Sequence, residues 1–286
     1  MAPELRVQRF HRAEAFLEAA GDFLTAREAE HNLLLGIAGT LVARPHIYPQ
    51  PPYLAAVMRG HEVVGVGLRT PPHGVVLSEV DEDVAVELLA ADAAELYAEL
   101  PSVFGPTEAS RRFAELWERG SGQVARKGMA QRAFRAERVR PAAEVPGAMR
   151  RAGEMDRDLL VDWIAAFQTD VGQGPPGRPP EEAVDDYLTR GESGGIYLWE
   201  DGEPVSVAGC GSPTPSGIRV GPVYTPPERR GRGYASALTA ELTATLLAGG
   251  RRFRFLFTDR ANPTSNRIYQ RIGYEPVTDV DEYRFE

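Results

Sequence analysis

Residues 226–239 read PPERRGRGYASALT, and this stretch decides the fold. Three arginines and two glycines follow a Pro-Pro pair, and the helix-like run YASALTAELTATLLAGG begins directly afterwards. The N-terminus of a helix presents unpaired backbone N–H groups and the positive end of its dipole, so it favours an anion. The sequence therefore predicts a phosphate-binding turn, whose kind depends on the segments around it.

Two common phosphate loops do not fit. Gly231, Gly233 and Ser236 approach the dinucleotide pattern G-x-G-x-x-G, and Asp259 could supply a ribose-binding acid. However, PPERR separates the strand-like IRVGPVYT from the first glycine, which is too long for the tight turn of that fold. A P-loop needs a lysine after its glycines, and Lys127 is the only lysine in the chain.

Two separated motifs instead resemble the GNAT superfamily of N-acetyltransferases. Its motif [QR]-x-x-G-x-[GA] is matched by Arg230, Gly233 and Ala235. A strand, RFRFLFTD, follows the helix, and NPTSNRIYQRIGYEPV (262–277) is similar to the family's N-x-x-x-N-x-x-Y ending. The resemblance covers about residues 150–286.

The resemblance implies that acetyl-CoA is the co-substrate and that its pyrophosphate lies on the amides of Arg232 to Ala235. Arg230 and Arg232 would add positive charge. The cofactor-binding residues that we expect are Val223, Tyr224, Thr225, Arg230, Gly231, Arg232, Gly233, Tyr234, Ala235, Ser236, Asn262, Ser265 and Asn266.

Gly221-Pro222 interrupts the strand RVGPVYT. Proline cannot donate to a strand ladder, so it belongs at an edge or a bulge. A bulge would separate this strand from RFRFLFTD and leave backbone groups of Val223 and Thr225 to pair with pantetheine. The N–H of Val223 or Tyr224 would then face the thioester oxygen, where negative charge develops. The alternative is an ordinary edge strand.

The resemblance makes Tyr269 the general acid that protonates the departing thiolate; a packing aromatic is the other interpretation. Asn262-Pro263 is a good helix cap and first residue, which would also explain Asn262. We expect Asn266 to contact the pantetheine or phosphate arm.

The sequence does not identify the general base. Asp259, Glu181, Glu182 and Asp185 are candidates, and none is singled out. The last three lie in or beside DVGQGPPGRPPEEA (170–183), whose Gly and Pro content predicts a loop, either disordered or acting as a substrate lid.

The N-terminal half repeats the plan of the C-terminal half. Residues 11–43 have helical patterning, and residues 53–72 read as two strands joined by a turn. Residues 196–215 repeat this hairpin scheme. The Pro- and Ala-rich segment 140–150 reads as a linker.

We therefore expect two domains: a degenerate acetyltransferase-like domain at 1–140 and a catalytic GNAT domain at 148–286. The fold class is α/β (α+β), with two tandem acetyltransferase-like units, each a mixed, mostly antiparallel sheet flanked by helices. In the first half Asp81, Glu82 and Asp83 stand where the basic turn would be, so we expect no cofactor there.

Composition narrows the partners. The chain has 286 residues and a net charge of −9, which disfavours nucleic acid and suits a cationic amine. The single cysteine, Cys210, lies in an apolar run and is expected in the core. No run could span a bilayer, nothing resembles a signal peptide, and the histidines lack metal-ligand spacing, so we expect a cytoplasmic protein without a metal.

The function that we expect is transfer of an acetyl group from acetyl-CoA to an amine by direct attack in a ternary complex. The acceptor would be a small-molecule or peptide amine, with the chain acting alone or as a homodimer. A non-catalytic acyl-CoA-binding regulator is the alternative.

Overall fold

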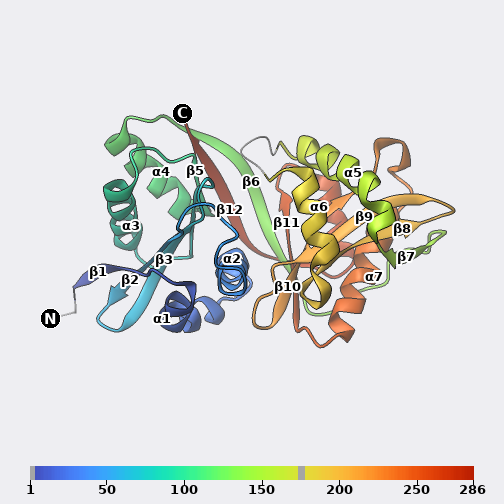
Figure 1. The fold of residues 1–286 in the computed structure, drawn as a ribbon, viewed down its shortest axis with the longest axis horizontal. Helices are drawn as coiled ribbons and strands as arrows, with labels where there is room; N and C mark the ends of the chain where they lie inside the picture. Colours follow the sequence, from blue (N-terminus) through green and yellow to red (C-terminus); the bar gives the residue numbers. More distant parts are fainter. Residues whose placement is uncertain (1–3, 173–177) are drawn as a thin grey trace. The chain divides into compact units, whose positions relative to one another are not determined.

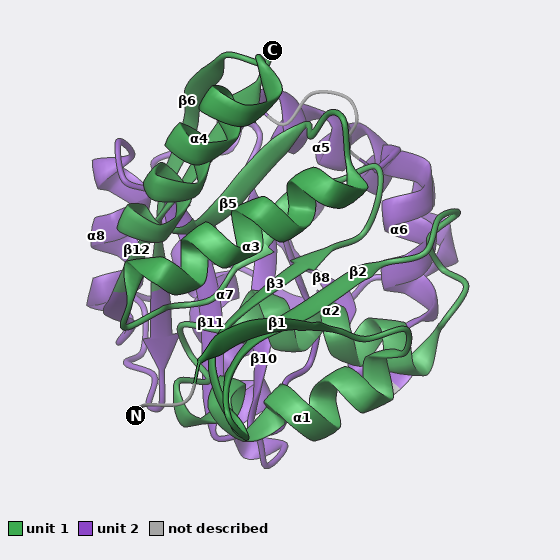
Figure 2. Cartoon of the chain, turned by 90° about the vertical axis from the view of Figure 1, so that its left-hand side faces the viewer, with its two compact units in different colours: residues 1–133, 278–286 green, residues 134–277 purple. Residues whose placement is uncertain are grey.

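The computed structural model describes residues 4–172 and 178–286. Part of the predicted loop, residues 173–177, therefore lies outside the described residues. The chain divides into two compact units, coloured separately in Figure 2: residues up to 133 together with 278–286 form unit 1, and residues 134–277 form unit 2. The domain boundaries expected from the sequence stay a prediction.

The first half of the chain consists of a strand, two helices, three strands, and then a helix, a strand, a helix and a strand (Figure 1). Its elements are β1 Leu5–Arg9, α1 Ala13–Ala26, α2 Asn32–Ala43, β2 Tyr53–Arg59, β3 Glu62–Arg69, β4 Val75–Leu77, α3 Asp83–Leu96, β5 Ser102–Pro106, α4 Thr107–Ser121 and β6 Ala125–Ala136.

The second half has the same order: a strand, two helices, three strands, then helix, strand, helix and strand. Its elements are β7 Ala148–Arg151, α5 Arg157–Asp170, α6 Pro180–Thr189, β8 Gly195–Glu200, β9 Pro204–Gly211, β10 Gly217–Tyr224, α7 Tyr234–Ala248, β11 Phe253–Asp259, α8 Pro263–Arg271 and β12 Glu275–Phe285. The expected tandem arrangement is confirmed.

Each unit has a mixed, mostly antiparallel sheet, as expected. In unit 1, β1 to β4 pair antiparallel, whereas β4 and β5 are parallel. The last residues of β12 then pair antiparallel with β5, with Val280 opposite Pro106. In unit 2, β7 to β10 pair antiparallel and β10 and β11 are parallel.

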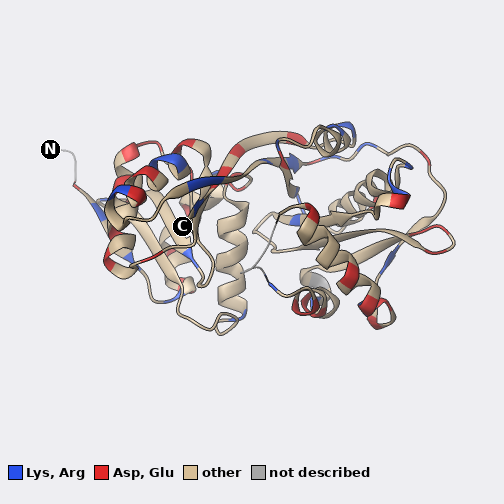
Figure 3. Ribbon diagram, turned by 90° about the horizontal axis from the view of Figure 1, so that it is seen from above, with Lys and Arg blue, Asp and Glu red and all other residues tan. Residues whose placement is uncertain are grey.

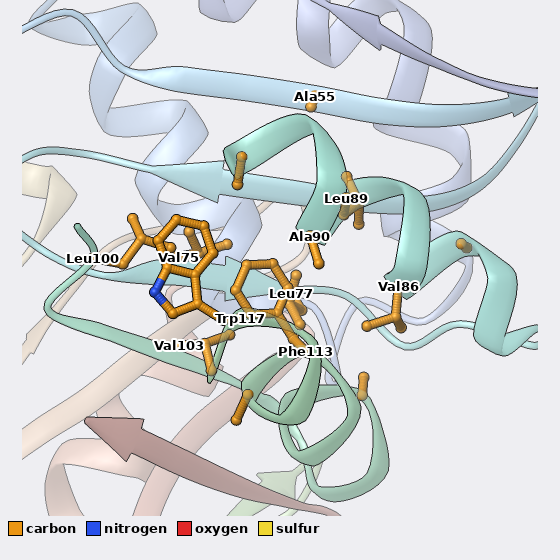
Figure 4. Packing of buried hydrophobic residues seen from close by; sticks show 14 of the residues in the cluster. Ala55, Val75, Leu77, Val86, Leu89, Ala90, Leu100, Val103, Phe113 and Trp117 are labelled. Carbon is orange, nitrogen blue, oxygen red and sulfur yellow. The ribbon is translucent and has the colours of Figure 1, made fainter. Parts of the chain in front are cut away.

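The core of unit 1 includes the sheet face beneath α3 and α4. Phe113 and Trp117 of α4 stack with ring centroids 6.1 Å apart, and they belong to one buried cluster with Val75, Leu77 and Val103 of the strands (Figure 4). A second cluster joins α1 and α2 to β2 and β3. The helices thus supply apolar stripes to the sheet.

In unit 2 helices cover both faces of the sheet. Ala208 lies in a cluster with Leu238 of α7, while its neighbour Val207 lies in a cluster with Leu160 of α5 and Val184 of α6. Because successive strand residues point to opposite faces, α7 lies on one face and α5 and α6 on the other.

Two element boundaries differ from the sequence expectations. Helix α6 begins at Pro180, inside the predicted loop, because proline is favoured at the first helical position and Glu181 and Glu182 suit the first turn. Strand β7 occupies the end of the predicted linker, since Ala148 pairs with Glu200 far along the chain.

Acidic and basic residues are interspersed along both units (Figure 3). Across the two described ranges, no helix is long and apolar enough to cross a membrane.

Candidate active site

Strand β10 parts from β11 partway along its length. The two strands pair from Gly217–Phe253 to Arg219–Phe255, and their pairing ends there. On its other side, β10 has a register shift against β9, between Val220 and Val223. The structure therefore contains the bulge that the Gly-Pro pair of β10 predicts, and the strand separates from its parallel neighbour at the same point.

The backbone beyond the bulge has a definite direction. The hydroxyl of Ser206 on β9 donates to the carbonyl oxygen of Tyr224 at 3.1 Å, so Tyr224 directs its backbone groups toward β9. Consecutive strand residues alternate, and Val223 therefore directs its N–H to the side of β11. Of the two N–H groups considered for the thioester oxygen, that of Val223 faces the separation. The carbonyl of Thr225 accepts from Nε of Arg230 at 2.9 Å.

The glycine turn that follows is shaped for a close approach to its backbone. Gly231 and Gly233 have φ of +79° and +88°, in the left-handed region that favours glycine. Gly233 is the N-cap of α7, and a Cβ at this position would lie 2.8 Å from Cγ1 of Val145. The first N–H groups of α7, including those of Ala235 and Ser236, have no partner within the helix and can bind an anion.

The side chains at this turn differ in their surroundings. Arg230 contacts Asp170 at 2.5 Å and its guanidinium lies 5.7 Å from the ring centroid of Tyr224, so it joins α5 to the end of β10. Arg232 is exposed at the turn. The hydroxyl of Tyr234 donates to Asp201 at 2.6 Å, which leaves only its backbone N–H for a ligand at the turn.

Helix α8 is joined to β11 by asparagine side chains. Asn262 caps the helix by accepting the N–H of Ser265 at 3.0 Å. The amide of Asn266 donates to the carbonyl oxygens of Asn262 at 2.8 Å and Asp259 at 3.0 Å. Its oxygen accepts from Thr258. In this structure the Asn266 side chain is thus committed to the chain itself, and its expected contact with the cofactor stays a prediction.

Tyr269 lies on α8 against the core of unit 2. Its ring meets that of Tyr274 edge-on, with centroids 5.9 Å apart, and it packs against a cluster that includes Leu256 and Ala240. Burial raises the pKa of Tyr269 to about 12. The hydroxyl therefore keeps its proton near neutral pH, as a general acid must.

Several candidate bases already have partners. Asp185 pairs with Arg157 at 2.7 Å, and Asp259 accepts the N–H of Ala261 at 2.8 Å. Burial also raises the pKa of Cys210 to about 11, which makes this thiol a poor nucleophile.

Sequence reasoning missed Tyr187 of α6, whose hydroxyl donates to the carbonyl oxygen of Gly221 in the bulge at 2.9 Å. Gly209 lies on the opposing strand, where a Cβ would meet that same oxygen at 2.9 Å. A glycine inside a strand indicates close backbone approach, so Gly209 was the available signal. Tyr187 is distant in sequence and gave none. Within 4–172 and 178–286, no group of His, Cys, Asp and Glu could hold a metal ion.

Residues 159–274 match the model of a family described as "Acetyltransferase (GNAT) family". The chain therefore carries a GNAT acetyltransferase domain, which contains the parted strands, the glycine turn and Tyr269. A comparison with curated protein sequences finds no match.

Solved structures similar to this chain have the same fold. A GCN5-related N-acetyltransferase from Sphaerobacter thermophilus is 18% identical, with a TM-score of 0.61, covering 99% of this chain and 96% of its own. A GNAT acetyltransferase from Colwellia psychrerythraea is 13% identical, with a TM-score of 0.57 and coverage of 98% and 100%. A tandem GNAT protein from the clavulanic acid biosynthesis pathway is 12% identical, with a TM-score of 0.58 and coverage of 98% of both chains.

Proposed function

We propose that this chain is an acetyl-CoA-dependent N-acetyltransferase that acts by direct attack of an amine in a ternary complex. One observation carries the proposal: β10 leaves β11 after Arg219–Phe255, a few residues before the glycine turn that begins α7. A strand edge and an anion-binding helix start thus follow each other along the chain, which suits a long ligand with phosphates at one end.

The residues present fit coenzyme A. The N–H groups at the start of α7 would hold its pyrophosphate, and the exposed Arg232 would add charge. The backbone of Val223 would pair with the pantetheine arm on the side that β11 leaves open. Acetyl-CoA supplies the acetyl group as a thioester.

The reaction uses groups of this chain at two positions. As the neutral amine attacks the thioester carbon, the N–H of Val223 stabilises the negative charge that grows on the oxygen. When the C–S bond breaks, the hydroxyl of Tyr269 donates its proton to the thiolate sulfur. The amine nitrogen also loses a proton. No carboxylate is assigned as its base, and in this mechanism water accepts the proton.

The acceptor that we propose is a small-molecule or peptide amine in the cytoplasm. The net charge of −9 favours a cationic partner, and amines are cationic before they lose a proton. The fold gives the class of reaction but does not select the amine.

A thiol-release assay against a panel of amines tests this function. Small amines, polyamines, amino acids, aminoglycoside antibiotics and peptide N-termini are each offered with acetyl-CoA. Release of free CoA that depends on one amine, with the acetylated product seen by mass spectrometry, supports the proposal. Binding of acetyl-CoA without release for any class would favour the non-catalytic regulator, and absence of binding would overturn both.

A further inference from the structure

The bulge in β10 is contacted by Tyr187 of α6 and packs against Gly209 of β9. Gly221 and Pro222 of β10 stand opposite the single residue Gly209 of β9, because Val220 pairs with Cys210 and Val223 with Ala208. A Cβ on Gly209 would meet Pro222 Cδ at 3.0 Å and Tyr187 Cε1 at 3.1 Å. The missing side chain lets the bulge and the Tyr187 ring lie against the strand.

Tyr187 holds the bulge by a hydrogen bond. Its hydroxyl donates to the carbonyl oxygen of Gly221 at 2.9 Å. This carbonyl lies in the segment where β10 no longer follows the register of β9, so the regular ladder does not fix its orientation. Burial raises the pKa of Tyr187, and the hydroxyl therefore remains a donor around neutral pH.

The ring of Tyr187 is itself fixed from the other side. The guanidinium of Arg190 lies 4.5 Å from the ring centroid, a cation–π distance. Arg190 pairs with Asp186 at 2.5 Å, and Arg178 pairs with the same carboxylate at 2.9 Å. The side chains of Asp186 and Arg190 are only 4% and 16% exposed, so this ion pair is largely shielded from solvent and restrains Arg190.

We propose that Tyr187 is a positioning residue that sets the Gly221 peptide so that the N–H of Val223, two residues later, points at the thioester oxygen. A turn of the Gly221 carbonyl would rotate the following backbone, and hydrogen-bond strength depends steeply on the angle at the donor. Tyr187 itself touches neither substrate. The inference rests on the proposed function, because it assumes that acetyl-CoA lies along β10.

The test uses the full-length protein with acetyl-CoA labelled with ¹³C at the thioester carbonyl, and it needs no acceptor. Isotope-edited infrared spectra report the C=O stretch, which falls in frequency when a hydrogen bond polarises the carbonyl. In the wild type we expect a lower frequency than for free acetyl-CoA. In Tyr187→Phe we expect the frequency to move back toward the free value, while the dissociation constant from calorimetry stays unchanged.

Tyr197→Phe is the matched control. Tyr197 lies on β8 of the same unit, its ring is contacted by Arg151, and it is partly buried like Tyr187. It should keep the wild-type frequency. Should Tyr187→Phe fail to fold, Gly209→Ala disturbs the same bulge from β9 and should give the same shift.

The outcomes separate this inference from the proposed function. Wild-type frequency in folded, acetyl-CoA-bound Tyr187→Phe overturns the role of Tyr187. Absence of acetyl-CoA binding by the wild type overturns the proposed function instead. With an amine from the panel, kcat of Tyr187→Phe should fall about tenfold, less than the 10²–10³ lost when an oxyanion donor is removed outright.

Discussion

The hydroxyl of Thr258 at the end of β11 donates to the side-chain oxygen of Asn266 on α8 at 2.5 Å. The nitrogen of the same amide donates back to the carbonyl of Asp259, so one side chain ties a strand end to a helix. Helix α8 has only nine residues and none of them is fully buried, so packing alone holds it weakly. Tyr269 follows Asn266 by one helical turn and depends on this attachment.

We predict that Asn266→Ala lowers the free energy of unfolding by about 1–2 kcal/mol, since each lost hydrogen bond contributes about 1 kcal/mol. Urea denaturation measures this loss. Arg267→Ala, at the exposed next position, should change stability little. Unchanged stability of Asn266→Ala combined with weaker acetyl-CoA binding would show instead that Asn266 contacts the cofactor.

Acetyl-CoA should stabilise the wild type against heat but not Gly233→Val. At a ligand concentration one hundred times the dissociation constant, the stabilisation corresponds to about 2.7 kcal/mol. The valine would be strained at φ +88° and its Cβ would crowd Val145. Its side chain should also keep the pyrophosphate from the backbone N–H groups of the turn.

Gly250→Val controls for the strain. Gly250 has the same φ of +88° at the other end of α7, with nothing within 4 Å of its Cβ position. This variant should lose stability yet keep the full thermal shift with acetyl-CoA. An equal shift in folded Gly233→Val would exclude the turn as the phosphate site.

Tyr269→Phe should lower kcat by about 10²–10⁴ while leaving the acetyl-CoA dissociation constant nearly unchanged. The ring keeps its contacts and only the proton donor is lost. A smaller loss is expected if water protonates the thiolate. Turnover at the wild-type rate, with an acceptor whose chemistry is rate-limiting, would leave Tyr269 as a packing residue.

The same tyrosine gives a pH prediction. Its pKa is raised to about 12, so the protonated donor persists far above the ordinary value of 10.0. The kcat profile should therefore show no fall due to this group between pH 7 and pH 10. A basic limb in that range that is present in the wild type and absent in Tyr269→Phe would show that Tyr269 loses its proton there, and would contradict the raised pKa.

Calorimetry should find one acetyl-CoA per chain. In unit 1 the helix after β4 is α3, which begins at Asp83 with Glu82 as its N-cap. Asp81 and Glu82 pair with Arg27 and Arg59 beside this helix start. Carboxylates therefore stand where a pyrophosphate would have to bind, and their negative charge disfavours it. Two molecules bound per chain, or one that persists in Gly233→Val, would place a site in unit 1.

Unit 1 should lose stability as the pH falls below about 6.5, because His31 is buried and neutral. Its Nδ1–H donates to the carbonyl of Leu24, and its Nε2 accepts the N–H of Glu79. Burial lowers its pKa from 6.5, so between the folded pKa and 6.5 the unfolded chain binds more protons than the folded chain. The free energy of unfolding therefore decreases as the pH decreases through this range, by at most about 1.4 kcal/mol per pH unit.

Urea denaturation at pH 7.5 and pH 5.5 checks this slope. His31→Gln should be less stable at pH 7.5 but less sensitive to the change in pH. His61→Gln, at an exposed position, should retain the wild-type slope. A wild-type slope in His31→Gln would assign the pH dependence to other groups.

Much of the fold could be predicted because its signals are local. The basic glycine turn, the helix after it and Asn262 as a cap follow from residue types within a few positions of each other. The Gly-Pro pair of β10 also predicted the bulge, since proline cannot complete a ladder. Each of these features depends on backbone geometry that the sequence sets directly.

The side-chain contacts of the candidate site could not be predicted from the sequence, because they join residues that are distant along the chain. Nothing near Tyr187 in the sequence indicates that its hydroxyl would reach Gly221, and Arg230 was expected to serve phosphate although it pairs with Asp170. The amide of Asn266 is likewise committed by the end of β11. Side-chain hydrogen bonds of this kind are decided by packing, which no short motif encodes.

The pairing of β12 with β5 has a consequence for biosynthesis. Residues up to 133 leave the ribosome first, but the part of β12 that belongs to unit 1 and pairs with β5 begins at residue 278, after all of unit 2. At 5–20 residues per second the intervening segment takes on the order of ten seconds to make. During that interval β5 presents an open row of N–H and C=O groups, the kind of edge that joins other nascent chains. The first unit to be translated is therefore the last to be completed.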